Sequence, residues 1–192
     1  MNSVDLIEDQ IKILDTRGMK LTGSNKDGVR FQGEGVYGNV FFSEQKGRVV
    51  KVYLKEGEHA NIFKTSLDKV FEMEKSALVL ANKTPELARF VPAYYGEVKV
   101  SEVIDKNGQD ISYKFHLDMA FEMEFIDGKS IKQPNSESSK LRELFAQYGI
   151  YGTDDMDCFY GPEGTIVKVV DITMKEYVLW DTGRVEVESK HY

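Results

Sequence analysis

A glycine-rich segment between two strand-like runs constrains the fold more than any other feature of this sequence. Residues 33–40 read Gly-Glu-Gly-Val-Tyr-Gly-Asn-Val, so glycine recurs in the pattern G-x-G-x-x-G-x-V. β-Branched and aromatic residues lie on both sides, at 29–31 and 40–42, and such residues favour strands. A dinucleotide-binding fold would instead place a similar pattern between a strand and a helix. The sequence therefore predicts a glycine-rich β-hairpin.

The remaining segments are predicted from hydrophobic periodicity and turn residues. Pro85 and Pro92 are expected to break the first helix, and residues 130–135 are expected to form a loop. Ser136 or Ser138 is expected to cap the second helix. This order of strands and helices is typical of an α+β fold with a mainly antiparallel sheet. The predicted elements are strands within 28–54, a helix over 59–81, strands over 94–104 and 112–125 around a turn at 106–108, a helix over 136–148, a turn at 161–164 and a strand over 165–170.

Composition excludes several classes of function. The chain has 192 residues, 41% of them hydrophobic, which suits a single globular domain. Its net charge of −7 lacks the basic excess of a nucleic-acid binder. One cysteine excludes an internal disulfide framework and a Cys-rich zinc site, and three scattered histidines argue against a multi-histidine metal centre. Residues 1–18 resemble a short amphipathic helix, not a signal peptide, and no stretch approaches the ~20 apolar residues of a membrane span.

A lysine in an apolar strand adds a candidate for chemistry. Lys51 follows Gly38 by 13 residues, within an apolar run at 48–53. Burying a lysine is costly unless it is paired, and the helix over 59–81 offers Glu72 and Glu74. These two lie about 200° apart around a helix, so only one can face inward. Because Glu74 shares its face with apolar residues, it is the predicted partner of Lys51, with Glu72 as the alternative.

With the glycine-rich hairpin, Lys51 and Glu74 in this order, the sequence resembles the protein kinases. In that family a glycine-rich hairpin covers the phosphates of ATP and a strand lysine binds the α- and β-phosphates. Residues 121–128, Phe-Glu-Met-Glu-Phe-Ile-Asp-Gly, are similar to the end of the fifth kinase strand and the hinge. The resemblance implies a gatekeeper residue, two backbone partners for adenine and an apolar contact with adenine. The implied ATP-binding residues are Gly33, Glu34, Gly35, Val36, Tyr37, Gly38, Val40, Val49, Lys51, Met123, Glu124 and Ile126.

The catalytic half resembles the family less closely. Asp154 ends a stretch similar to H-R-D in which Gly152 and Thr153 replace histidine and arginine. The resemblance implies that Asp154 is catalytic, with Lys51 and Glu74, and that it orients the attacking hydroxyl and accepts its proton. Loss of the arginine argues against control by phosphorylation of an activation segment.

Two further aspartates are expected to hold Mg²⁺. The family's metal-binding asparagine, five residues after the catalytic aspartate, is Phe159 here. Asp157 is the expected substitute, because Mg²⁺ prefers oxygen ligands, and Asp155 remains an alternative as metal ligand or even as the catalytic residue. Residues 171–173, Asp-Ile-Thr, resemble D-F-G, which implies that Asp171 binds Mg²⁺.

Only 21 residues follow Asp171, so a strongly reduced C-lobe is expected. In this the chain resembles the minimal kinases that some bacteria inject into host cells by type III secretion. One such family phosphorylates a host heat-shock chaperone. The resemblance implies one minimal kinase-like domain over residues 1–192, with an N-lobe at about 20–124, a hinge at 124–128 and a C-lobe at 129–192.

The expected function is that of an ATP- and Mg²⁺-dependent kinase of protein Ser/Thr residues. The implied effector would act as a monomer on a host protein such as a chaperone, with neither nucleic acid nor membrane as a partner. It would enter the host cytosol without a signal peptide; a bacterial cytoplasmic location is the alternative. A pseudokinase or docking module without phosphotransfer is the alternative function. A small-molecule phosphotransferase usually carries a long helical insertion, which is missing here.

Overall fold

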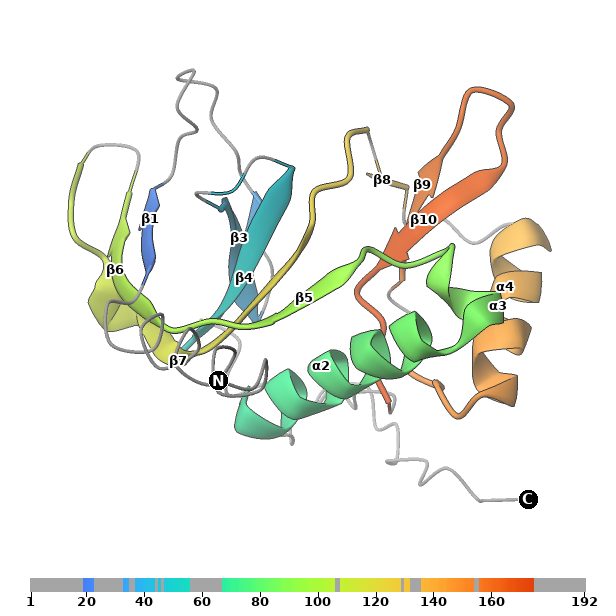
Figure 1. The fold of residues 1–192 in the computed structure, drawn as a ribbon, viewed down its shortest axis with the longest axis horizontal. Coiled ribbons are helices and arrows are strands. Elements are labelled where there is room, and N and C mark those ends of the chain that lie inside the picture. Colours follow the sequence, from blue (N-terminus) through green and yellow to red (C-terminus); the bar gives the residue numbers. More distant parts are fainter. Residues whose placement is uncertain are drawn as a thin grey trace, which may run out of the picture. The chain divides into compact units, whose positions relative to one another are not determined.

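The computed structural model describes residues 19–22, 33–34, 37–43, 45, 47–55, 67–105, 108–128, 130–131, 136–153 and 156–174 (Figure 1). Helices and mainly antiparallel sheets are combined, which agrees with the predicted α+β class. The chain divides into two compact units. The first comprises residues 1–57 and 95–123, and the second comprises residues 58–94 and 124–192.

The first unit contains a five-stranded sheet. Two antiparallel pairings set its register. Gly33 lies opposite Val40 in the first pairing, and Phe41, the next residue, lies opposite Val50 in the second. The glycine-rich segment therefore joins two antiparallel strands, as predicted, although Gly35 and Val36 lie outside the described residues. The strands, in spatial order, are β2 (Gly33–Glu34), β3 (Gly38–Phe42), β4 (Arg48–Leu54), β7 (Phe115–Glu124) and β5 (Tyr94–Glu97).

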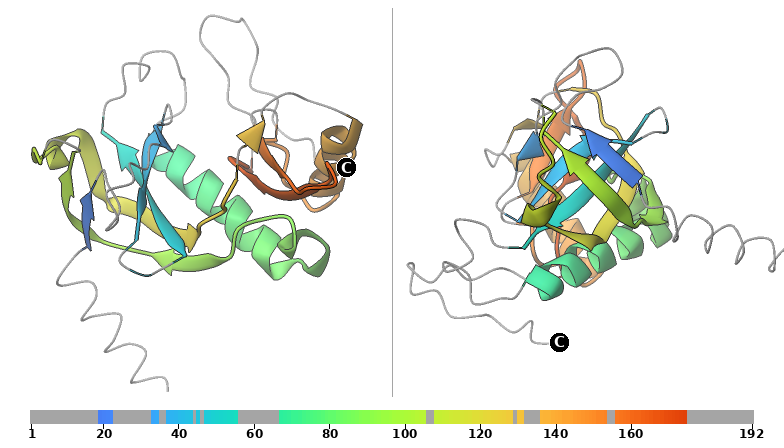
Figure 2. Two further views of the ribbon diagram at one scale, coloured as in Figure 1. Left: turned by 90° about the horizontal axis from the view of Figure 1, so that it is seen from above. Right: turned by 90° about the vertical axis from the view of Figure 1, so that its left-hand side faces the viewer.

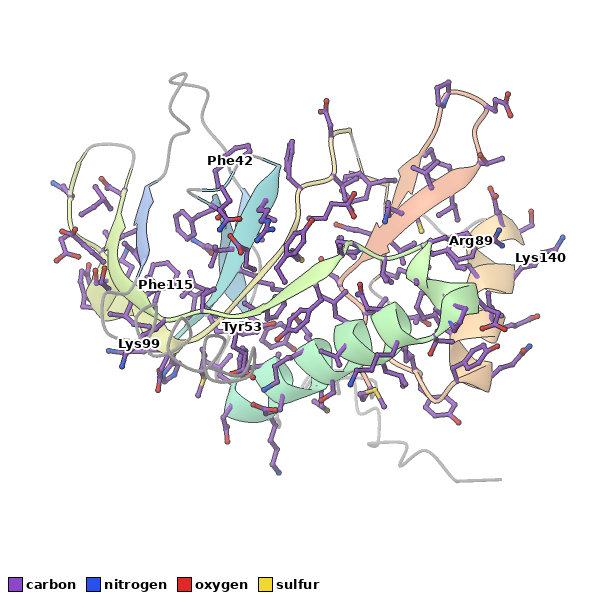
Figure 3. The ribbon with its side chains drawn as sticks, viewed as in Figure 1. Phe42, Tyr53, Arg89, Lys99, Phe115 and Lys140 are labelled. Carbon is purple, nitrogen blue, oxygen red and sulfur yellow. The ribbon has the colours of Figure 1, made fainter. Side chains whose placement is uncertain are left out.

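Strand β4 is buried on both of its faces. Its run Val-Val-Lys-Val-Tyr is rich in β-branched residues, which favour extended backbone. Val50 and Val52 belong to an apolar cluster that includes Phe41 and Phe115, of which Phe115 is labelled in Figure 3. The rings of Phe41 and Phe115 meet edge to face, with their centres 6.0 Å apart. A second sheet pairs β1 (Met19–Thr22) in parallel with β6 (Val100–Ile104), which supplies two more valines of that cluster.

The described residues of the second unit form three helices and a small antiparallel sheet. Its helices are α2 (Leu67–Lys83), α3 (Pro85–Ala88) and α4 (Ser136–Gln147). Its strands are β8 (Ser130–Ile131), β9 (Asp157–Tyr160) and β10 (Ile166–Val170), with β9 in the centre (orange in Figure 2). The buried residues of α2 recur every three or four positions, which is why this segment packs as an amphipathic helix; they are Val70, Phe71, Glu74, Ala77, Leu78 and Ala81.

Several predicted boundaries are wrong. The first helix ends at Lys83 instead of residue 81, and Pro85 begins α3 instead of simply ending a helix. Proline suits the first turn of a helix because its missing N–H would have no partner there. The predicted loop at 130–135 begins with β8, and Ser138 is a buried residue within α4, so it is not the cap. Residues 59–66 lie outside the described part of the chain.

The strand predicted over 94–104 is two strands with different partners. Strand β5 lies beside β7, whereas β6 pairs with β1. Gly96 has a φ of 128°, a conformation that favours glycine. The turn expected at 106–108 is closed by a hydrogen bond from the Gly108 N–H to the Asp105 carbonyl, 3.0 Å long. In the part of the chain that the structure describes, no helix is long and apolar enough to cross a membrane.

Candidate active site

Lys51 is buried in the middle of β4, with only 8% of its surface exposed. Because it lies directly opposite Val40 in the β3–β4 pairing, the two side chains share one face of the sheet. Val49 and Tyr53 lie two residues away on the same face, and the Lys51 Nζ is 5.5 Å from the centre of the Tyr53 ring. The structure thus brings together three residues that were predicted to bind ATP: Val40, Val49 and Lys51.

The end of the glycine-rich segment lies tightly against β4. A Cβ atom added at Gly38 would be 2.6 Å from the backbone oxygen of Val52, so no side chain fits there. The carbonyl of Tyr37 accepts a 2.9 Å hydrogen bond from the Leu54 N–H. Gly38 is therefore required by the close approach of two strands, whatever the loop binds.

Helix α2 directs Glu74 inward and Glu72 outward. Glu74 is 6% exposed, whereas the Glu72 side chain is 59% exposed and forms an ion pair of 2.7 Å with Lys75. The orientation predicted from helical geometry is confirmed. The pairing of Glu74 with Lys51 stays a prediction, because the two residues belong to different units.

The predicted hinge begins where the chain passes from the first unit to the second. Met123 is buried at the end of β7, and the boundary follows it directly. The Glu124 N–H donates to the Ala93 carbonyl at 2.9 Å. Ile126 is half-buried in the irregular segment after β7. The backbone groups predicted to contact adenine therefore lie at the last residue of β7, Glu124, and in the irregular segment after it, at Ile126.

Two of the predicted aspartates lie at one end of the β9–β10 hairpin. Asp157 is paired with Val170, and Asp171 follows Val170 directly in the chain. Both aspartates are half-buried. Asp171 has a φ of 58° and is, among the described residues, the only non-glycine residue with a positive φ. Aspartate tolerates this conformation better than most residues, and such backbone outliers concentrate at functional sites.

An isolated bridge holds the segments next to these aspartates. The Gly152 N–H donates to the Thr173 carbonyl at 3.0 Å, and the Thr173 N–H donates to the Gly152 carbonyl at 2.9 Å. Thr153 and Thr173 are buried. The predicted catalytic Asp154, and the alternative Asp155, follow Thr153 but lie outside the described residues. No periodicity in the sequence signals this bridge, because it pairs single residues.

Binding of Mg²⁺ by Asp157 and Asp171 stays a prediction. Among the described residues, no group of three or more His, Cys, Asp or Glu side chains could hold a metal ion. Magnesium commonly takes only one or two carboxylates, together with phosphate oxygens and water. Asp157 and Asp171 would fit that pattern. The neighbouring Cys158 is buried, and burial raises the pKa of its thiol more than the nearby positive charge of Arg142 lowers it.

Comparisons with protein-family models, with curated proteins and with solved structures found no match to this chain.

Proposed function

We propose that the chain is a protein kinase that transfers the γ-phosphoryl group of ATP to a serine or threonine hydroxyl of a protein. The observation that carries the proposal is the buried Lys51 on a strand directly after a glycine-rich antiparallel hairpin. A buried ammonium next to a glycine hairpin is the arrangement that kinases use to hold ATP phosphates. The proposal includes a kinase-like fold.

Each of the predicted residues has a role in this reaction. Lys51 would bind the α- and β-phosphates, and Glu74 would orient its ammonium group. Asp157 and Asp171 would hold Mg²⁺, which offsets the negative charge of the phosphates when bound. Asp154 would orient the substrate hydroxyl and take its proton as the oxygen attacks the γ-phosphorus, while the bond from that phosphorus to the β–γ bridging oxygen breaks and ADP leaves. The backbone at Glu124 and Ile126 would bind the adenine edge.

The proposal extends to the biological setting that the resemblance implies. We propose a bacterial effector that acts in the host cytosol as a monomer on a host protein such as a chaperone. A bacterial cytoplasmic enzyme is the alternative. The chain's acidic net charge of −7 supports a protein substrate over a nucleic acid.

The test compares two lysines of the same strand region with labelled ATP, Mg²⁺ and a eukaryotic lysate. Lys51→Met should lower phosphoryl transfer by about 100-fold or more, because the phosphates lose their positioning group. Lys55→Met is the matched control, since Lys55 is exposed just after β4. Circular dichroism should show that both variants fold.

The outcomes separate the proposal from its alternative. ATP binding without transfer by the wild-type protein would favour the pseudokinase or docking module. Absence of both binding and transfer, in protein shown to be folded, would contradict the proposal. Equal activity of Lys51→Met and Lys55→Met would remove Lys51 from the site.

A further inference from the structure

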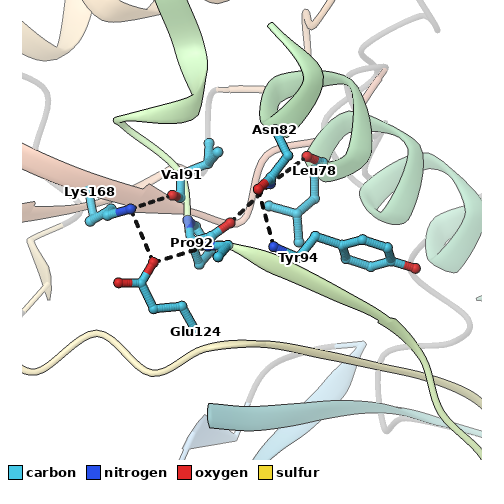
Figure 4. Close-up of polar contacts among 8 residues, drawn as sticks. Leu78, Asn82, Val91, Pro92, Tyr94, Glu124 and Lys168 are labelled. Atoms are coloured by element: carbon cyan, nitrogen blue, oxygen red, sulfur yellow. Dashed lines mark hydrogen bonds and ion pairs between the residues drawn. The ribbon is translucent and has the colours of Figure 1, made fainter. Parts of the chain in front are cut away.

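An asparagine on α2 fixes one side of the segment that joins α3 to β5 (Figure 4). The Asn82 Nδ2 donates to the Leu78 carbonyl at 2.9 Å and to the Pro92 carbonyl at 3.0 Å. Its Oδ1 accepts a hydrogen bond of 3.2 Å from the Tyr94 N–H. Both the nitrogen and the oxygen of this amide are thus hydrogen-bonded within the second unit, and two of the three bonds attach the joining segment and the start of β5 to the helix.

A lysine on β10 fixes the other side of the same segment. The Lys168 Nζ donates to the Val91 carbonyl at 2.6 Å and forms an ion pair of 3.1 Å with Glu124 Oε2 (Figure 4). The same carboxylate oxygen accepts a hydrogen bond of 3.0 Å from the Ala93 N–H. The adjacent Val169 N–H donates to the Phe90 carbonyl at 2.7 Å.

These contacts lie where the chain leaves the second unit and where it returns. The chain leaves after Tyr94 and re-enters at Glu124. Lys168 contacts the backbone of the first crossing, at Val91, and the side chain of the second, at Glu124. It is also only three residues before Asp171 on the same chain. One ammonium group therefore links the predicted adenine-binding segment to the strand that leads to a predicted metal ligand.

We propose that Lys168 is a positioning residue, which fixes the segment at Glu124–Ile126 relative to Asp171. This inference rests on the proposed function. The Lys168 and Glu124 side chains are 23% and 36% exposed, so their attraction is weakened by solvent. The hydrogen bond from Lys168 to the Val91 carbonyl also holds the ammonium group in place. If the two ends of ATP are bound by parts held at a fixed spacing, binding of one end raises the effective concentration of the other.

The first test measures the binding of two probes by calorimetry. Adenosine probes the adenine end alone, and Mg·ATP probes both ends. Lys168→Gln should raise the dissociation constant of Mg·ATP by about tenfold, the typical effect of losing a charge-assisted hydrogen bond, and that of adenosine by less than about twofold. Lys140→Gln is the matched control, because Lys140 is exposed on α4 in the same unit (Figure 3). Lys168→Arg should restore part of the Mg·ATP affinity.

The second test needs no nucleotide. In Lys168→Gln, the amide hydrogens of Ala93, Glu124 and Val169 should exchange about tenfold faster than in the wild-type protein, whereas that of Val50 in the other unit should not change. Glu124→Gln should give the same pattern, and the double variant should add little to either single one.

The two tests distinguish failure of this inference from failure of the proposed function. Unchanged exchange rates, or an unchanged Mg·ATP affinity in Lys168→Gln, would overturn the positioning role even in an active kinase. A wild-type protein that binds neither probe would overturn the proposed function and with it the nucleotide coupling. The amide exchange rates would then still show whether the contacts of Lys168 with Val91 and Glu124 hold the segment.

Discussion

At the scale of single residues, Glu122 shows how the sheet of the first unit accommodates a buried carboxylate. The Ser43 hydroxyl donates to one carboxylate oxygen, and the Arg48 Nη1 donates to the other at 3.0 Å. The Arg48 guanidinium also stacks 3.6 Å above the centre of the Tyr95 ring. Burying a charge is unfavourable unless it is paired and hydrogen-bonded. These contacts provide such partners, and they join β4, β5 and β7 to Ser43, the residue after β3.

Glu122→Gln should therefore destabilise the first unit. The amide keeps the volume but loses the charge that Arg48 contacts, so we expect the free energy of unfolding to fall by about 1–3 kcal/mol in urea titrations. Asp118→Asn, an exposed change on the same strand, should alter it by less than about 0.5 kcal/mol. Equal effects of the two substitutions would show that the buried contacts contribute nothing specific.

Gly38 gives a second prediction, which separates packing from nucleotide binding. In Gly38→Ala the new methyl group meets the fixed backbone oxygen of Val52, and overpacking of this kind costs about 1–3 kcal/mol. In Gly161→Ala it would lie 2.9 Å from Cγ1 of Val167, an exposed side chain that can rotate away. Thermal unfolding without nucleotide should show a larger loss for Gly38→Ala, and the reverse order would contradict this explanation.

At the scale of elements, the sequence predicts the helices and strands that have a recognisable local pattern of residues. Helix α2 follows from its three- and four-residue periodicity and strand β4 from its β-branched and aromatic residues. Helical geometry alone distinguishes Glu74 from Glu72. Strand β8 has only two residues, too few for a period. The division of 94–104 depends on pairing partners far away in the chain. The same holds in the site, where Lys168 and Glu124 are 44 residues apart and no local signal joins them.

Strand β9 offers a test through the single cysteine of the chain. Cys158 is buried, and burial raises the pKa of its thiol. At neutral pH the folded protein should react with iodoacetamide at least about 100-fold more slowly than the protein unfolded in guanidinium, because the thiolate is the reactive form. Mass spectrometry after timed quenching measures both rates, and a native rate close to the unfolded one would place the thiol at the surface.

The same shift predicts how stability depends on pH. The unfolded thiol ionises near pH ~8.5, whereas the folded thiol ionises at a higher pH. The stability contributed by the neutral buried thiol is therefore complete below about pH 8.5 and is lost as the pH rises toward the folded pKa. In urea titrations, the free energy of unfolding of Cys158→Ala should fall less with rising alkaline pH than that of the wild-type protein. An equal fall in both proteins would mean that other groups cause it.

At the scale of the whole molecule, neither unit is a continuous stretch of chain. The first unit is built from residues 1–57 and 95–123, and the second from 58–94 and 124–192. In the first unit, β7 lies between β4 and β5, so a strand of the later segment pairs with β4 of the earlier one. In the second, α2 and α3 precede β7, whereas α4 and β8–β10 follow it. Contacts between distant segments must therefore form before either core is complete.

This interleaving predicts that fragments 1–94 and 95–192 fold only together. Fragment 1–94 keeps β3 and β4 but lacks Phe115 and Ala120, so Val50 and Val52 lose much of their apolar cluster. Each fragment alone should give poorly dispersed amide resonances and no cooperative urea transition, and an equimolar mixture should recover both. A chain cut within the turn at 161–164 is the control, because the cut leaves the first unit whole. Cooperative unfolding of fragment 1–94 by itself would show that β2–β4 do not need β7, and that the first unit is assembled in a different order from the one its topology requires.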